Sequence, residues 1–230
     1  MIAIIGAMDG EIKEILTHTD MQQSREWNGF QFHTGLFENK KVVVAKGGVG
    51  KVMIAMLTQK LIDEYAPEMI IFTGIAGALN PELEVGDIVV ARDCMQHDLD
   101  ATALGFKRGE VPYSPHYIQK TDETLYQIAM RYAPDGHNVK SGRILTGDQF
   151  ITTASTQQAT FLRDKLGGDA IEMEGASLGL VSELNEIPFL IIRTISDKAD
   201  KKAHVDFSKF LPEASKANCQ MLRHIFQLLS

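Results

Sequence analysis

Acidic residues gather in two short stretches of this sequence, each next to apolar residues. Glu172 and Glu174 follow one apolar stretch, and a second apolar run ends in Arg193, Ser196 and Asp197. Charged residues rarely end a buried strand unless something there needs charge or protons. Because the carboxyl ends of strands in an α/β domain open onto the ligand crevice, the pattern indicates a functional site.

The composition is that of an ordinary globular protein. A chain of 230 residues can bury roughly 70–75% of its unfolded surface without a disulfide or a metal. The net charge of −7 argues against a nucleic acid or an anionic membrane as partner, since both bind basic surfaces. No basic segment precedes the apolar N-terminus, and no apolar run approaches the ~20 residues that span a bilayer. With Cys94 and Cys219 far apart and expected to be reduced, we predict a soluble cytoplasmic protein.

Strand-like and helix-like segments alternate along the chain. Strands are expected at residues 2–6, 30–37, 41–45, 69–73, 87–93, 139–145 and 188–195. Helices are expected from near Asp9 and at residues 50–65, 121–132, 156–165, 174–184 and 207–229, with a loop at 105–116. No linker or internal repeat divides the chain, so we predict one domain over residues 1–230. The alternation predicts an α/β fold with a central sheet covered by helices.

Three further stretches each allow two interpretations. Residues 47–52 are similar to a phosphate-binding loop but lack its first glycine and its hydroxyl residue, which leaves a ligand-contacting turn or a plain tight turn. Residues 73–77 present the same choice after a buried strand, and there we favour the ligand. His97, Asp98 and Asp100 could form a metal cluster, but without a second His or Cys group nearby we favour a polar strand end or loop.

Eight motifs occur in a fixed order along the chain. They are Gly6-Ala7-Met8-Asp9-Gly10-Glu11, Lys46-Gly47-Gly48-Val49-Gly50-Lys51, Thr73-Gly74-Ile75-Ala76-Gly77, Val85-Gly86-Asp87, His97-Asp98-Leu99-Asp100-Ala101-Thr102, Gly147-Asp148-Gln149-Phe150-Ile151, Glu172-Met173-Glu174 and Ser196-Asp197. Together they closely resemble the 5′-methylthioadenosine/S-adenosylhomocysteine nucleosidases, within the purine nucleoside phosphorylase/nucleosidase superfamily. The resemblance implies a three-layer α/β/α fold around a twisted, partly closed mixed sheet. It also implies an intracellular homodimer and a hydrolase, free of metal and cofactor, that cleaves the N-glycosidic bond to adenine.

The resemblance implies roles for the charged residues. Asp197 would protonate adenine N7, with Ser196 orienting its carboxyl group. Glu11 would hold and deprotonate the attacking water, with Arg193 nearby, and Glu174 would accept both ribose hydroxyls. Cleavage of the C1′–N9 bond by water passes through an oxocarbenium-like sugar, which a ring of carboxylates would stabilise.

Other positions carried over from the family would contact the base, the ribose or the 5′ substituent. These substrate contacts are assigned to Met8, Val49, Ile75, Ala76, Gly77, Phe150, Ile151, Glu172, Met173 and Phe207. Among them, Phe150 would stack on the base, and Val49 and Phe207 would wall the 5′ substituent. A loop over residues 101–112 would reach into the partner subunit's 5′ pocket through Ala101, Leu104, Phe106 and Pro112.

Two rival functions remain open. A purine nucleoside phosphorylase would need arginines around a phosphate dianion, whereas Asp9 and Glu11 stand in the N-terminal loop and residues 73–77 contain no basic residue. A non-catalytic adenine-nucleoside binding protein would need the pocket but no acid to activate water. The presence of the full set of charged site residues therefore favours the hydrolase.

The chain departs from the family pattern at Ile75, where the usual motif TGSAGG has a serine close to the ribose and the water. Leu104 and Phe106 stand where Phe and Tyr are frequent, which changes the wall contributed by the partner subunit. These differences leave the preference among methylthioadenosine, adenosylhomocysteine, 5′-deoxyadenosine and aminodeoxyfutalosine undecided.

Overall fold

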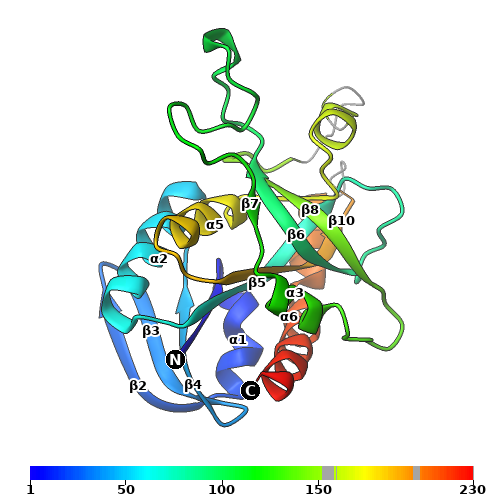
Figure 1. Cartoon of the computed structure of the whole chain (residues 1–230). Helices are drawn as coiled ribbons and strands as arrows, with labels where there is room; N and C mark the ends of the chain where they lie inside the picture. The colour runs from blue at the N-terminus through cyan, green and yellow to red at the C-terminus, as the bar shows by residue number, and fades with distance from the viewer. Residues whose placement is uncertain (152–157, 159, 199–202, 230) are drawn as a thin grey trace.

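Strands and helices make up most of the chain (Figure 1). The computed structural model describes residues 1–151, 158, 160–198 and 203–229, with only the backbone for 203–208. Its strands are β1 (Ile2–Gly6), β2 (Asp20–Trp27), β3 (Phe30–Phe37), β4 (Lys40–Lys46), β5 (Met69–Ala78), β6 (Ile88–Gln96), β7 (Gln119–Lys120), β8 (Val139–Thr146), β9 (Ala170–Glu172) and β10 (Phe189–Asp197). Its helices are α1 (Asp9–Thr17), α2 (Lys51–Tyr65), α3 (Glu123–Ala129), α5 (Gly175–Leu184) and α6 (Ala203–Leu228), with a 3₁₀ turn at Thr102–Leu104 and a π-helical turn at Phe161–Lys165. Among the described helices, none is long and apolar enough to cross a membrane.

The strands form one mixed sheet that is closed at one end. Its order is β10-β6-β8-β9-β5-β1-β4-β3-β2, and β7 pairs with β6. Because β10 also pairs with β5, the strands β5, β9, β8, β6 and β10 form a closed ring (Figure 1). The remaining strands extend from β5 as an open sheet. The predicted α/β fold with a partly closed mixed sheet is confirmed.

Helices cover both faces of the sheet. Side chains alternate along β1, so that Ala3 and Ile5 enter one core with α2 and α5, while Ile2 and Ile4 enter a second core with α1, α3 and α6. Helix α2 packs on α5, and both α1 and α3 pack on α6. The sheet is therefore the middle of three layers.

Strand β5 corrects one prediction. Residues 73–77 were expected to turn after a strand that ended at Thr73, because they contain two glycines. The strand instead continues to Ala78, since β10 pairs with it in parallel as far as Gly77. Pairing on that side outweighs the low strand propensity of glycine. The segment still faces the cavity described below.

Several short or polar strands, and the exact bounds of one helix, were not predicted from the sequence. Strand β2 (Asp20–Trp27) is almost wholly exposed at the edge of the sheet, so it shows no alternation of apolar residues. Strands β7 and β9 are too short to produce a periodic signal. Helix α3 is shorter than the expected 121–132: it begins after Asp122, whose side chain caps it by accepting from the Leu125 amide, and it ends at Ala129. Of the helix expected at 156–165, residues 156, 157 and 159 lie outside the described residues.

Candidate active site

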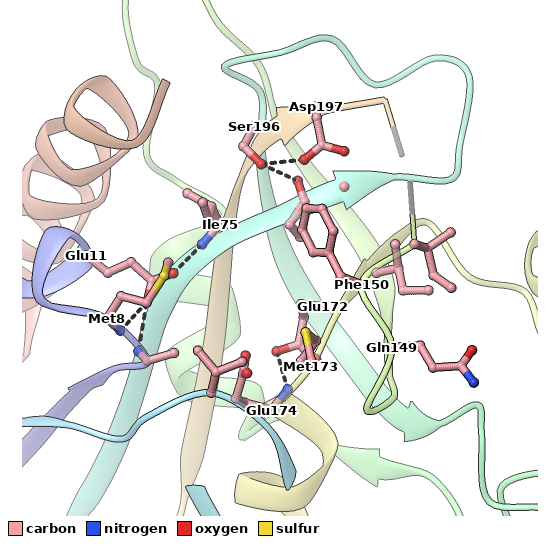
Figure 2. Close-up of a pocket in the computed structure, with 16 residues that line it drawn as sticks. Met8, Glu11, Ile75, Gln149, Phe150, Glu172, Met173, Glu174, Ser196 and Asp197 are labelled. Carbon is pink, nitrogen blue, oxygen red and sulfur yellow. Dashed lines mark hydrogen bonds between the residues drawn. The ribbon is translucent and has the colours of Figure 1, made fainter. Parts of the chain in front are cut away.

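One cavity opens near the carboxyl ends of β1, β9 and β10, beside β5 (Figure 2). The space inside it, including its open mouth, is about 650 Å³. The predicted residues that line it are Met8, Glu11, Val49, Ile75, Ala76, Gly77, Phe150, Ile151, Glu172, Met173, Glu174, Ser196 and Asp197. Three lining residues were not predicted, although each adjoins a predicted one: Ala7 and Ile171, which have apolar side chains, and Gln149, which has a neutral amide.

Glu11 is buried in the first turn of α1 and is held by backbone amides. Its Oε2 accepts from Ala7 N at 2.7 Å and Met8 N at 3.0 Å, and its Oε1 accepts from Ile75 N at 3.0 Å. Reaching back to the Met8 amide is the geometry of a helix capping box. Burial raises the pKa of Glu11, whereas the Arg193 guanidinium and the three amides oppose the rise. Glu11 is thus a fixed carboxylate that accepts a proton more readily than an exposed one.

The backbone of β5 makes room for Glu11. A Cβ atom at Gly74 would lie 2.5 Å from Glu11 Oε1 and 3.4 Å from Arg193 Nη1, so this position cannot hold a side chain without displacing the acid. The pairing of β1 with β5 begins at Met69 and extends no further than Phe72. Beyond that point the Ile75 amide donates to the Glu11 carboxylate instead.

Glu172 and Arg193 form a buried ion pair. Arg193 Nη2 donates to Glu172 Oε2 at 2.8 Å, and Arg193 Nη1 donates to backbone carbonyls. The Glu172 carboxylate also accepts from the amides of Glu174 and Gly175 and from the Thr146 hydroxyl. Its oxygens are therefore engaged by the protein itself. Arg193, which was expected near the water, does not line the cavity and binds Glu172 instead.

Glu174 is equally buried but has fewer donors. Within the described part of the chain, its side chain accepts one hydrogen bond, from Gly50 N to Oε1 at 2.8 Å. Burial raises the pKa of Glu174 to about 8, and the neighbouring Glu172 carboxylate adds to the rise. A ligand that brings two hydroxyl donors, such as a vicinal diol, would supply what this carboxylate lacks.

Asp197 stands at the end of β10, on the other side of the cavity from Glu11 (Figure 2). It is 3% exposed, and the Ser196 hydroxyl donates to its Oδ2 at 2.8 Å. The predicted orientation of Asp197 by Ser196 is consistent with this contact. The cavity therefore has carboxyl groups on separate sides, which is the arrangement that acid and base steps on one ligand require.

Apolar side chains form the rest of the wall. Met8 and Met173 flank the carboxylates, and Phe150 projects into the cavity (Figure 2). Val49 and Phe150 are 52% and 47% exposed. Large apolar side chains left open beside carboxylates suit a ligand that is flat and apolar on one part and polar on another.

The glycine-rich turn between β4 and α2 contributes structure rather than a phosphate loop. Gly50 donates its amide to Glu174, and Lys51 pairs with Asp98 at 2.7 Å. Asp100 pairs with Arg108. The acids once considered as metal ligands are therefore bound to cations, and no group of at least three potential ligands gathers among the described residues.

The remaining predicted residues lie elsewhere. Ala101, Leu104, Phe106 and Pro112 do not line this cavity, and Leu104 is 67% exposed. Phe106 contacts Tyr113 edge to face. The side chain of Phe207 lies outside the described part, although its backbone belongs to α6.

Comparison with known proteins connects this geometry to a family. The family model described as "Phosphorylase superfamily" matches residues 1–227. Over 230 residues, covering 100% of both chains, the sequence is 35% identical to the 5′-methylthioadenosine/S-adenosylhomocysteine nucleosidase of Staphylococcus haemolyticus. The chain belongs to this nucleosidase family. It is also 36% identical to the aminodeoxyfutalosine nucleosidase of Campylobacter jejuni, with 96% of each covered.

A solved structure extends the nucleosidase likeness to three dimensions. The Neisseria meningitidis 5′-methylthioadenosine/S-adenosylhomocysteine nucleosidase, in complex with methylthio-immucillin-A, matches with a TM-score of 0.93 at 34% identity, covering 99% of both chains. The family and the fold predicted from the eight motifs are both confirmed.

Glu174→Gln should change how stability depends on pH. Folded Glu174 keeps its proton up to about pH 8, while the unfolded chain releases it near 4.5, so this group destabilises the native state progressively across that window. Glutamine removes the effect. The difference in melting temperature, variant minus native chain, should therefore increase as the pH is raised from about 5 to about 8.

The matched control is Glu26→Gln on the exposed strand β2. Its melting temperature relative to the native chain should stay constant across the same range. A constant difference for Glu174→Gln as well would show that Glu174 ionises normally in the folded protein.

Proposed function

We propose that this protein hydrolyses the N-glycosidic bond of 5′-substituted adenosines, methylthioadenosine and adenosylhomocysteine among them, and releases adenine. The observation that carries the proposal is the placement of the carboxyl groups in the cavity. Glu11 and Asp197 stand on separate sides, and Glu174 offers acceptor capacity that a sugar diol would fill. Membership of the nucleosidase family supports the same reaction.

The substrate is bound by the apolar wall of the cavity and by the Glu174 carboxylate. The ribose hydroxyls donate to the Glu174 carboxylate, and Met8 and Met173 pack around the sugar. The adenine lies against Phe150, and the Ile151 backbone reads its edge. The donors brought by the diol lower the cost of ionising Glu174 in its buried place.

The reaction uses the two outer carboxyl groups. Glu11 holds a water, which attacks C1′ and gives its proton to Glu11. The C1′–N9 bond breaks, its electrons go to the purine, and Asp197 donates a proton to N7. Charge on the oxocarbenium-like sugar is stabilised by the surrounding carboxylates. Arg193 lies outside the cavity lining, where it donates a hydrogen bond to Glu172. Its positive charge also opposes the rise in the pKa of Glu11.

Phosphorolysis fits the cavity poorly. Among the described residues that line it, none is a lysine or an arginine, while four are carboxylic acids. A phosphate dianion close to Glu11 would be repelled by several kcal/mol, on the order expected for like charges at intermediate dielectric. Water carries no such cost.

Substrate breadth is the open part of this proposal. Relatives of nearly equal identity are a 5′-methylthioadenosine/S-adenosylhomocysteine nucleosidase and an aminodeoxyfutalosine nucleosidase. The substrates in these names share an adenine–ribose core and differ in the 5′ substituent. The residues proposed for the core therefore serve any of these substrates, and 5′-deoxyadenosine as well.

A homodimer would complete the pocket. Val49, Val52, Met53 and Met56 leave apolar side chains exposed around the start of α2, and Val52 is 77% exposed. Such a group of apolar side chains marks an interaction surface. In this proposal a second copy covers it and extends its own loop 101–112 into the cavity, and the dimer acts in the cytoplasm in salvage of methionine.

Purified protein should release adenine in phosphate-free buffer. Incubation with methylthioadenosine should produce adenine and free 5-methylthioribose at a rate that added phosphate does not raise, because water is the nucleophile. Chromatography of the sugar product measures this. A phosphorylated sugar as the main product would establish phosphorolysis, and tight binding without turnover would establish a binding protein.

Asp197→Asn should separate leaving-group protonation from binding. The amide still contacts N7 but cannot donate a proton in the same way, so turnover of an adenine nucleoside should fall by about 10²–10⁴. A nitrophenyl riboside, whose leaving group departs without protonation, should be slowed far less. Equal slowing of both compounds with a lowered melting temperature would assign Asp197 a structural role.

Ile75→Ser should change the selectivity among 5′-substituted adenosines. The serine keeps the backbone amide that binds Glu11 and adds a hydroxyl to the cavity wall. Relative kcat/KM values across the substrate panel should shift by about fivefold, the effect of one hydrogen bond of about 1 kcal/mol. Ile75→Val, which stays apolar, should leave the ratios as they are. Unchanged ratios in both variants would mean that this side chain does not contact the reacting ligand.

A further inference from the structure

A line of buried hydrogen bonds runs from α6 to Glu11. Thr194 Oγ1 donates to Asn218 Oδ1 at 2.8 Å, and Asn218 Nδ2 donates to the Gly74 carbonyl at 2.9 Å. The next amide, Ile75 N, donates to Glu11 Oε1 at 3.0 Å. Thr194 and Asn218 are both 0% exposed. Nothing in the reaction described above uses either of them.

One peptide unit joins the two halves of this line. The Gly74 carbonyl and the Ile75 amide belong to the same trans peptide, so they point in opposite directions. Asn218 therefore binds one edge of the peptide, and Glu11 binds the other. The orientation of the Asn218 amide is fixed, because a carbonyl can only accept and must face Nδ2.

The Gly74–Ile75 peptide lies in the paired part of β5, opposite Arg193 and Thr194 of β10, and Asn218 adds a side-chain contact to that pairing. Gly74 has no side chain to restrict its backbone, and none can be added, because a Cβ would lie 2.5 Å from Glu11 Oε1. Rotation of the peptide would turn the Ile75 amide away from Glu11. Asn218 of α6 opposes this rotation together with the pairing to β10, and Ser215 of the same helix donates to the Glu11 carbonyl at 3.4 Å.

We propose that Asn218 is a positioning residue that acts through the Gly74–Ile75 peptide to hold Glu11 ready to accept a proton. Its hydrogen bond reinforces the orientation that pairing with β10 gives the peptide, and it polarises the peptide, so the Ile75 amide becomes a stronger donor to the ionised Glu11. The catalytic consequence rests on the proposed role of Glu11 as the base, whereas the physical effect on Glu11 does not.

Among the described residues, the hydrogen bonds of the Asn218 side chain go to Thr194 and Gly74 and not to the other charged groups around Glu11. Arg193 and Asp197 come from β10, and Glu172 and Glu174 come from the β9–α5 junction. On the side of α1 and β4, the exposed Asp9 pairs with Lys46. From α6 come the neutral hydroxyl and amide already described. A change in Glu11 after substitution of Asn218 therefore reports on the peptide.

Asn218→Leu removes the donor and keeps a side chain of similar size. Carbon-detected NMR of protein with labelled glutamate carboxyl groups measures the titration of Glu11, with its signal assigned by Glu11→Gln. The pKa of Glu11 should rise by about 0.5–1 pH unit, because the ionised form loses a donor. Thr194→Val, which removes only the far end of the line, should cause a smaller shift in the same direction.

Leu222→Ala is the matched control for damage to α6. Leu222 is 0% exposed in the core on the same helix, and its side chain has no group that could donate to the Gly74 carbonyl. Its substitution should lower the melting temperature without moving the Glu11 titration. If Asn218→Leu fails to fold, Asn218→Ala is measured in the same way.

Kinetics separate this inference from the proposed function. In Asn218→Leu the acid limb of the kcat profile should move to higher pH with KM nearly unchanged, so the loss of turnover shrinks as pH rises. An unmoved Glu11 titration, or the same shift in Leu222→Ala, would overturn the inference. Absence of adenine release by the native chain would overturn the proposed function, and the NMR titration would still decide the role of Asn218.

Discussion

The site depends on how a few hydrogen-bond donors are shared among buried carboxylates. Glu11, Glu172, Glu174 and Asp197 all line one cavity and are nearly inaccessible to solvent. Among the described residues, Arg193 is the only buried lysine or arginine. Since several like charges cannot all be ionised cheaply in a dry site, each carboxylate takes its properties from the donors that reach it.

The fold delivers those donors unequally, and the chemistry follows from the inequality. The amides at the start of α5 and the Arg193 guanidinium donate to Glu172 and hold its carboxyl group in place at the cavity wall. The end of β1 and the bare backbone of β5 hold Glu11 by three amides. Glu174 receives one amide, from Gly50, and is left with capacity for a ligand. In the proposed mechanism, these three glutamates therefore take different roles: Glu172 anchors Arg193, Glu11 is the base and Glu174 binds the sugar.

Much of this could be predicted from the sequence. The apolar runs that become β1, β4 and β10 and the ordered motifs were sufficient for the fold class and the family. The motifs were also sufficient for most residues around the cavity, because the resemblance to the family carries their positions over one by one. The partnership of Arg193 with Glu172 could not be predicted, since it joins β10 to the end of β9, a strand too short to recognise. The exposed edge strand β2 was missed because its polar side chains show no period.

The roles of some residues depend on contacts with residues distant in the sequence, which only the folded structure shows. Asn218 is an unremarkable polar residue in an amphipathic helix until α6 brings it to the Gly74 carbonyl. Gly74 is likewise one glycine of a presumed turn until β10 pairs with β5 and Glu11 occupies the space of its missing side chain.

The central claim is that Glu11 is the base that activates water, and Glu11→Gln tests it most directly. Turnover of methylthioadenosine and the dissociation constant of a non-hydrolysable adenine nucleoside are measured together, with Glu14→Gln on the same helix as control. Turnover of Glu11→Gln should fall by about 10²–10⁴ while the dissociation constant changes little, and Glu14→Gln should behave as the native chain does. Near-native turnover in Glu11→Gln would contradict the account.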